Sequence, residues 1–309
     1  MKAMIDFDTA PPFGIPTSDG LGVRVGMLIE CPQGWGEFSP ASGCDGAVDA
    51  RWLTAAVEGG TVGWPDPLRG RIPIAVSVAA VGPASARSTV EASGCRTADV
   101  TVGVDSLEAD AARLGAVRDA LGLEGRIRLR GNGSWSVEEA VRAIDVLAAA
   151  AGELDFVAHP CRTAAELAAV RRRVQVAIAA GVSSAEAVDV VILRTSPLGG
   201  VRRALRVAER LERPCVVSSS GETSIGLASG LALAGALPEL PFACALGTVS
   251  LLAGDLVAGP RSLRPVDGYL PVAPASAGPD PVLLQRYALT DSARVDRWRR
   301  RLQAARTAD

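Results

Sequence analysis

The residues of this sequence that could carry chemistry stand where short apolar runs end. Asp99 and Thr101 close one run, and Arg130 closes a second. His159 and Arg194 close two later runs. We expect these runs to be parallel strands, and barrels built from strands and helices have their chemistry at the carboxyl ends of the strands. These five residues are therefore the candidate catalytic residues.

His159 is the only histidine of the chain. Imidazole has an ordinary pKa near neutrality, so His159 is the best general acid or base on offer. Adjacent residues of a strand face opposite ways. If Ala158 faces the barrel mouth, His159 faces the helices, unless the strand has already ended. The sequence leaves both directions open.

Asp99 and Arg130 are expected on neighbouring strands, directed at the same mouth. In one interpretation they form a buried ion pair with a structural role. In the other, Arg130 and Arg194 hold an anionic substrate while Asp99 serves as a base. Thr101 can form hydrogen bonds but has no evident base to activate it.

Residues 218–226 form a run of small polar residues between a predicted strand and a predicted helix. Backbone N–H groups at a helix start can bind an anion. The candidate substrate-binding residues are therefore Asn132, Ser218, Ser219, Ser220, Glu222 and Ser224. The alternative is that serine and glycine only form the turn and cap the helix.

Strand-like runs alternate with segments of helical periodicity from about residue 72 onward. The predicted strands are 74–78, 97–102, 126–129, 156–158, 176–179, 190–193, 215–218 and 243–245, and the predicted helices include 107–121, 137–151, 163–173 and 200–211. This alternation predicts right-handed crossovers and a parallel sheet, and so many units favour a closed barrel.

The expected fold class is therefore α/β, a (β/α) TIM-type barrel with a small α+β capping domain. A hairpin or meander at 22–38 and a helix at about 49–58 place the capping domain at residues 1–70. The barrel is predicted over residues 71–258. Residues 259–309 begin as a segment rich in proline and glycine and are predicted to return and pack on the barrel and cap.

Composition argues against several partners. A formal net charge of -2 and a pI near 5.7 give no reason to expect nucleic acid or an anionic membrane. No apolar run reaches the roughly 18 residues of a spanning helix, and the first residues do not resemble a signal peptide, so we expect a cytoplasmic protein. The six cysteines lack the C-x-x-C spacing of zinc sites. The expected partner is a small anionic molecule, and a homo-oligomer is compatible with the sequence.

Several ordered motifs carry a family resemblance. They include Gly34-Trp-Gly-Glu-Phe38, Asn132-Gly-Ser-Trp135, Pro197-Leu-Gly-Gly200 and the run at 216–226. Together they resemble the o-succinylbenzoate synthase family, in the muconate-lactonizing-enzyme subgroup of the enolase superfamily. The resemblance implies dehydration of a cyclohexadiene carboxylate. In that family a lysine of a K-x-K element removes the proton beside the carboxylate, and a bound Mg²⁺ stabilises the resulting enediolate.

The family's functional positions hold other residues in this sequence. The K-x-K element falls on Asp99-Val100-Thr101 and the second lysine on Arg194, while the three metal-ligand positions fall on Arg130, Ala158 and the region of Gly181-Val182. Lys2 is the only lysine of the chain. A guanidinium is nearly always protonated and cannot replace lysine as a base. We therefore expect the Mg²⁺ site to be lost, with no metal bound and no cofactor used.

Three functional hypotheses follow. The first is a metal-independent dehydratase, isomerase or cyclase that acts on a small carboxylate-bearing metabolite of a specialised biosynthetic pathway. The second is a non-catalytic pseudoenzyme that keeps the barrel to bind a ligand or partner. A true Mg²⁺-dependent o-succinylbenzoate synthase of menaquinone biosynthesis is placed last.

Overall fold

The structure is a computed structural model that describes residues 5–18, 20–43 and 45–308. The amino-terminal part is a three-stranded antiparallel sheet in the order β1-β2-β3, followed by helix α1. The bounds are β1 Pro12–Pro16, β2 Val23–Cys31, β3 Gly34–Phe38 and α1 Gly46–Thr61. The predicted meander is thus centred on one long strand, and the helix extends past the expected 49–58 at both ends.

Helix α1 lies directly against strand β3. Trp52 and Ala56 of the helix are buried against Phe38 of the strand in one apolar cluster. At Gly36 the backbones approach so closely that a Cβ atom would lie 1.7 Å from the carbonyl oxygen of Ala56. Only glycine permits this approach, which fixes the position of the helix on the sheet.

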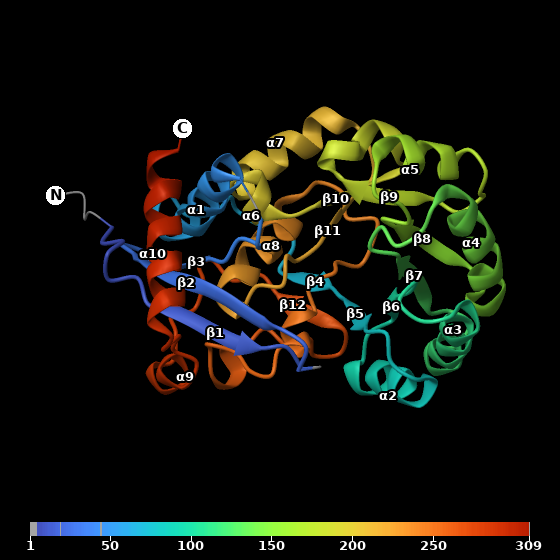
Figure 1. Cartoon of the computed structure of the whole chain (residues 1–309), viewed down its shortest axis with the longest axis horizontal. Helices are drawn as coiled ribbons and strands as arrows, with labels where there is room; N and C mark the ends of the chain where they lie inside the picture. The colour runs from blue at the N-terminus through green and yellow to red at the C-terminus, as the bar shows by residue number, and fades with distance from the viewer. Residues whose placement is uncertain (1–4, 19, 44, 309) are drawn as a thin grey trace.

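A parallel sheet of seven strands, in the order β11-β10-β9-β8-β7-β6-β5, forms the barrel wall (Figure 1). Its strands are β5 Ala75–Val78, β6 Thr97–Thr101, β7 Arg126–Arg130, β8 Leu154–Ala158, β9 Ile178–Gly181, β10 Val190–Leu193 and β11 Cys215–Val217. Parallel bridges from Ile74 to Cys244 and from Ser218 to Ala245 join the two edges. Residues 243–245, which were predicted to form a strand, therefore close the barrel through two isolated bridges.

Helices cover the outside of this sheet (Figure 1). They are α2 Pro83–Ser93, α3 Leu107–Leu121, α4 Val137–Ala151, α5 Ala164–Arg171, α6 Thr195–Leu198, α7 Val201–Leu211 and α8 Ser224–Ala236. Helices α3 and α4 have the predicted bounds, since Ser106 and Ser136 cap their first turns. The class of fold is the one expected, an α/β barrel with a small amino-terminal domain, whereas the boundaries at residues 70 and 258 stay predictions.

Alternating strand residues divide the core into two layers. Val100, Leu129 and Val157 are buried in the main cluster, which also contains helix residues such as Leu114. Phe156 and its strand neighbours belong to a separate cluster on the inner face of the strands. The barrel is therefore packed inside as well as outside, and its polar residues are concentrated at the strand ends.

The carboxyl-terminal segment returns to the amino-terminal domain, as Figure 1 shows. It contains β12 Tyr269–Pro271, which pairs with β4 Arg71–Pro73, and helices α9 Pro281–Arg286 and α10 Ser292–Thr307. Helix α10 buries Leu302 and Ala305 in the cluster that contains α1. Arg301 also places its Nε 2.6 Å from Asp49 Oδ2 on α1.

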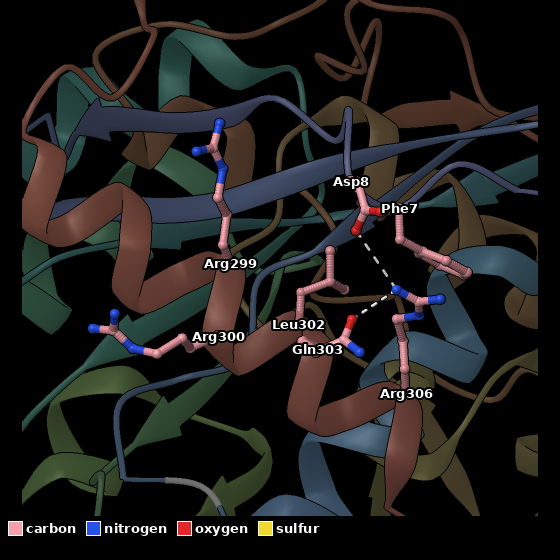
Figure 2. Close-up of a pocket in the computed structure, with 7 residues that line it drawn as sticks. All are labelled: Phe7, Asp8, Arg299, Arg300, Leu302, Gln303 and Arg306. Atoms are coloured by element: carbon pink, nitrogen blue, oxygen red, sulfur yellow. Dashed lines mark hydrogen bonds and ion pairs between the residues drawn. The ribbon is translucent and has the colours of Figure 1, made fainter.

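The outer side of α10 is basic, and a shallow groove separates it from Phe7 and Asp8 (Figure 2). Arg306 lies over the Phe7 ring and pairs with Asp8. Arg299 and Arg300 point away from one another in Figure 2, so these guanidiniums do not converge on one ligand position. The arrangement is that of a solvated helix face.

Two further sequence-based expectations concern the whole chain. None of the helices in the described ranges is long and apolar enough to cross a membrane. The cysteines that the structure describes are buried and free, namely Cys31, Cys95, Cys161, Cys215 and Cys244. Cys44 and Lys2 lie outside the described residues.

Candidate functional site

Asp99 is the centre of a charged cluster at the carboxyl ends of β6 and β7. The residue is 5% exposed. Asp99 Oδ2 lies 2.9 Å from Arg130 Nη2 and 3.3 Å from Arg128 Nε. Burial by itself raises the pKa of Asp99, but the guanidiniums of Arg130 and Arg128 outweigh it, so the net shift is downward. Asp99 is therefore an ionised partner of two arginines.

Arg128 is the member of this cluster that the sequence analysis missed. It is 1% exposed and lies beside Asp99 in the strand register. Its Nη1 donates to the carbonyl of Ala243 at 2.6 Å, and its guanidinium lies over the ring of Phe156. The sequence does contain a signal for Arg128. Residues two apart on a strand share a face, so the spacing of Arg128 and Arg130 indicates that both side chains face the barrel interior.

His159 faces the barrel mouth. Strand β8 ends at Ala158, and His159 has φ of 47°, in the left-handed region. The alternation of strand faces has therefore stopped, and both Ala158 and His159 line the same cavity. Burial, and then the positive charges of Arg194 and Arg130, lower the pKa of His159 to about 4. The imidazole is neutral at pH 7.

Arg194 completes the basic side of the mouth. It follows strand β10, and its Nε donates to the carbonyl of Ser219 at 3.2 Å. The cavity between these groups has a volume of about 20 Å³. Its polar lining is Asp99, Arg128, Arg130, His159, Arg194 and Ser218. A space of this size holds roughly one water-sized group, so the side chains fill most of the mouth.

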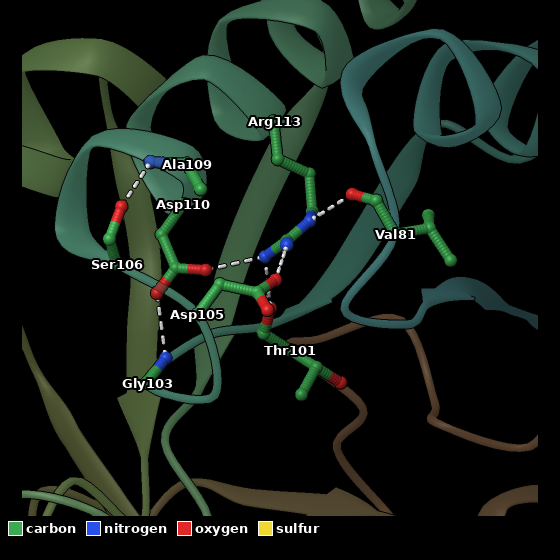
Figure 3. Close-up of polar contacts among 8 residues, drawn as sticks. All are labelled: Val81, Thr101, Gly103, Asp105, Ser106, Ala109, Asp110 and Arg113. Atoms are coloured by element: carbon green, nitrogen blue, oxygen red, sulfur yellow. Dashed lines mark hydrogen bonds and ion pairs between the residues drawn. The ribbon is translucent and has the colours of Figure 1, made fainter.

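Two other predicted residues lie outside this cavity. Asn132 is exposed and has φ of 52° in the loop after β7. Thr101 is half-buried, and its carbonyl accepts a hydrogen bond from Arg113 Nη1 at 3.1 Å. Figure 3 shows Arg113 joining the ends of two strands, since it also donates to the carbonyl of Val81 and pairs with Asp110 and Asp105. This buried network fixes the backbone at Thr101.

The run at 218–226 already satisfies many of its own backbone donors. Glu37, from strand β3 of the amino-terminal domain, accepts from the N–H groups of Thr223 and Gly226. Asp255 accepts from the N–H of Ser224. These carboxylates occupy the start of α8, where the sequence suggested a substrate anion.

The side chains of this turn are also engaged within it. Glu222 is 3% exposed and accepts from the N–H of Ser220 and the hydroxyls of Ser219 and Ser196. The hydroxyl of Ser224 donates to Asp255. Of the predicted substrate-binding residues, Ser218 is the one that lines the cavity.

The fold and the position of this site define an enolase-like protein. A model described as enolase C-terminal domain-like matches residues 83–278, and one described as enolase N-terminal domain-like matches residues 19–60. The muconate lactonizing enzyme from Pseudomonas fluorescens superposes with a TM-score of 0.76 and 19% identity over 93% of this chain and 98% of that chain. The L-Ala-D/L-Glu epimerase from Bacillus subtilis superposes with a TM-score of 0.73 and 19% identity over 89% and 97%. At such identity these structures establish the fold alone.

Within the enolase superfamily, the chain belongs to the o-succinylbenzoate synthase family. The o-succinylbenzoate synthase of Thermobifida fusca is 47% identical over 97% of this chain and 96% of its own length. That of Mycolicibacterium smegmatis is 42% identical over 89% and 87%. The chain is thus a member of a family of lyases.

These relatives overturn two sequence-based expectations. A metal-independent enzyme or a pseudoenzyme was placed ahead of an o-succinylbenzoate synthase, and that order is wrong because the high identity spans nearly the whole chain. The expectation that no cofactor is used is also wrong for a member of this family, whose chemistry uses Mg²⁺. Both errors came from weighing a few strand-end positions above the rest of the sequence.

The residues at the mouth do not themselves fit an Mg²⁺ ion in this arrangement. Within the described ranges, no group of three or more His, Cys, Asp or Glu side chains could hold a metal. Mg²⁺ prefers oxygen ligands, whereas the carboxylate of Asp99 is bound by guanidiniums and Ala158 offers no side-chain ligand atom. No chemical step is therefore derived through the ion.

Proposed function

We propose that this chain is a lyase that forms o-succinylbenzoate by dehydrating a hydroxylated cyclohexadiene carboxylate. The observation that carries the proposal is the 47% identity to the Thermobifida fusca enzyme over 97% of this chain. That match includes both the residues of the amino-terminal sheet and those of the barrel. A cytoplasmic location, the absence of nucleic-acid partners and a homo-oligomer stay predictions.

The reaction needs a proton acceptor and an anion-binding group. A proton leaves the carbon beside the carboxylate and is passed on to the ring hydroxyl, which leaves as water, and the ring becomes aromatic. In our proposal Arg130 and Arg194 bind the carboxylate, since both line the cavity. His159 takes the proton, because its imidazole is neutral and its Nε2 has no hydrogen-bond partner among the described residues.

Other residues have supporting roles in this proposal. Asp99 holds Arg130 in place, and Thr101 and Asn132 border the mouth. Ser218 contacts the substrate directly. Ser219, Ser220, Glu222 and Ser224 keep the turn in shape through the hydrogen bonds they already make.

The test is direct. Purified protein is incubated with the hydroxylated cyclohexadiene carboxylate in Mg²⁺ and, separately, in EDTA, and o-succinylbenzoate is quantified by chromatography. We expect enzyme-dependent product in Mg²⁺, because the family uses this ion, and the EDTA reaction measures how far turnover depends on it. Absence of product in both reactions, from protein with an intact thermal transition, would disprove the proposal.

A further inference from the structure

The barrel mouth contains more positive than negative charge. The guanidiniums of Arg128, Arg130 and Arg194 line the cavity, while the carboxylates that act on them are Asp99 and Glu222. His159 adds no charge at pH 7 because its pKa is about 4. A buried charge that lacks a partner is costly. The site is therefore one negative charge short of balance, which an anion would supply.

Arg128 also has a donor that nothing in the described ranges accepts. Its Nη1 bonds to Ala243 and its Nε faces Asp99, but its buried Nη2 has no hydrogen-bond partner. Buried polar groups in native proteins are nearly always bonded. Arg128 is 1% exposed and lines the cavity, so an acceptor bound in this interior space could satisfy the donor.

The size of the space limits what that acceptor can be. A cavity of about 20 Å³ admits a single atom the size of a water oxygen. The side chain of Arg130 is 26% exposed, so the cavity has a route to solvent beside it. One oxygen of a carboxylate fits these limits, with the remainder of its molecule in the mouth.

We propose that this cavity binds one carboxylate oxygen of the substrate, and that Arg128 is a substrate-binding residue alongside Arg130 and Arg194. The identity of the anion as the substrate's carboxylate rests on the proposed function. The existence of an anion site does not, since it follows from the charges and the unpaired donor.

The first experiment probes the site without turnover. Crystals grown without halide are soaked in sodium bromide, and anomalous scattering locates the bound ions. Sodium formate, the smallest carboxylate, is titrated by calorimetry. We expect bromide in the cavity beside Arg128, and formate binding that weakens about tenfold in Arg130→Gln through loss of a charge-assisted hydrogen bond. Arg126→Gln is the matched control, because Arg126 lies on the same strand but is half-exposed and paired with Asp155 at the opposite end.

The outcomes separate this proposal from the proposed function. Formate that competes with the substrate in the dehydration assay supports the assignment to the substrate's carboxylate, and non-competitive inhibition overturns that assignment. An empty cavity in the bromide-soaked crystals, or equal formate affinity in the Arg130→Gln and Arg126→Gln proteins, overturns the anion site. Arg128→Met tests the buried donor itself. If that variant fails to fold, the bromide and Arg130→Gln results still decide.

Discussion

At the scale of single residues, His159 owes its position to an unusual backbone conformation. Its φ of 47° turns the imidazole into the mouth directly after the last strand residue. Left-handed φ values are several-fold enriched for asparagine among non-glycine residues. A His159→Asn variant therefore keeps the backbone and removes only the imidazole.

For His159→Asn we predict a fall in kcat of about 10²- to 10⁴-fold, the usual contribution of a general base, with KM nearly unchanged. Steady-state kinetics of o-succinylbenzoate formation measure the effect. The thermal transition of the variant serves as the folding control. A kcat within a few fold of the wild type would remove His159 from the mechanism.

The buried imidazole also makes stability depend on pH. The folded-state pKa of His159 is lowered to about 4, from an ordinary value of 6.5, because burial disfavours the charged form. The unfolded chain therefore binds the proton more readily. The contribution of His159 is fully present above pH 6.5 and is lost as the pH falls through about 4, at a rate of at most about 1.4 kcal/mol per pH unit.

This dependence can be isolated by comparison with His159→Asn. We predict that the difference in unfolding free energy between wild type and variant shifts against the wild type as the pH falls from 6.5 to 4, and is constant from pH 7 to 8. Urea denaturation at each pH measures it. If the unfolding free energies of wild type and variant differ by the same amount at every pH, the imidazole is solvated in the folded protein.

At the scale of elements, the contact of α1 with β3 depends on one missing side chain. A Cβ at Gly36 would meet backbone atoms of Ala56, which cannot rotate away. We predict that Gly36→Ala destabilises the protein by about 1–3 kcal/mol, as overpacking usually does. Gly46→Ala is the matched control, because a Cβ there meets nothing within 4 Å. Urea midpoints that agree for the two variants would show that α1 shifts freely on the sheet.

The elements also show what sequence reasoning can reach. The bounds of α3 and α4 were predicted from helical periodicity, and in the structure each helix begins at a capping serine, which is also a local feature of the sequence. The direction of the His159 side chain was not predicted, since it depends on the φ value of a single residue. The engagement of the α8 start by Glu37 was not predictable either, because the two residues are far apart in the chain. Local hydrogen bonds are visible in a sequence, whereas contacts between distant segments are not.

The same distinction between local features of the sequence and contacts formed in the fold applies to the candidate site. Strand ends identified Asp99, Arg130, His159 and Arg194, and all of them line one cavity. Their electrostatic relations required coordinates, because the neutral state of His159 and the unpaired donor of Arg128 arise from burial. Positions of side chains on a barrel edge were thus predictable, and their protonation was not.

At the scale of the whole molecule, the amino-terminal domain and the barrel mouth are coupled. Glu37 lies on β3 and bonds to Thr223 and Gly226, at the turn whose Ser218 lines the cavity. The hydroxyl of Ser39 donates to the same carboxylate at 2.6 Å. A displacement of the turn at 218–226 is therefore transmitted to the sheet of the small domain.

Such a displacement is required for binding. A space of about 20 Å³ cannot admit a ring that bears a carboxylate and a succinyl arm, so the mouth must widen around the ligand. The loop at 131–135 follows Arg130, which lines the cavity, and the turn at 218–226 contributes Ser218 to the lining, so a widening of the mouth has to move these two segments. We predict that o-succinylbenzoate slows amide hydrogen exchange in these two segments and in β3, through Glu37.

Helix α10 packs on the far side of the small domain and should exchange at the same rate with and without the product. Equal protection of α10 and the mouth would indicate global stabilisation in place of local closure, and unchanged exchange at 131–135 would place the ligand elsewhere.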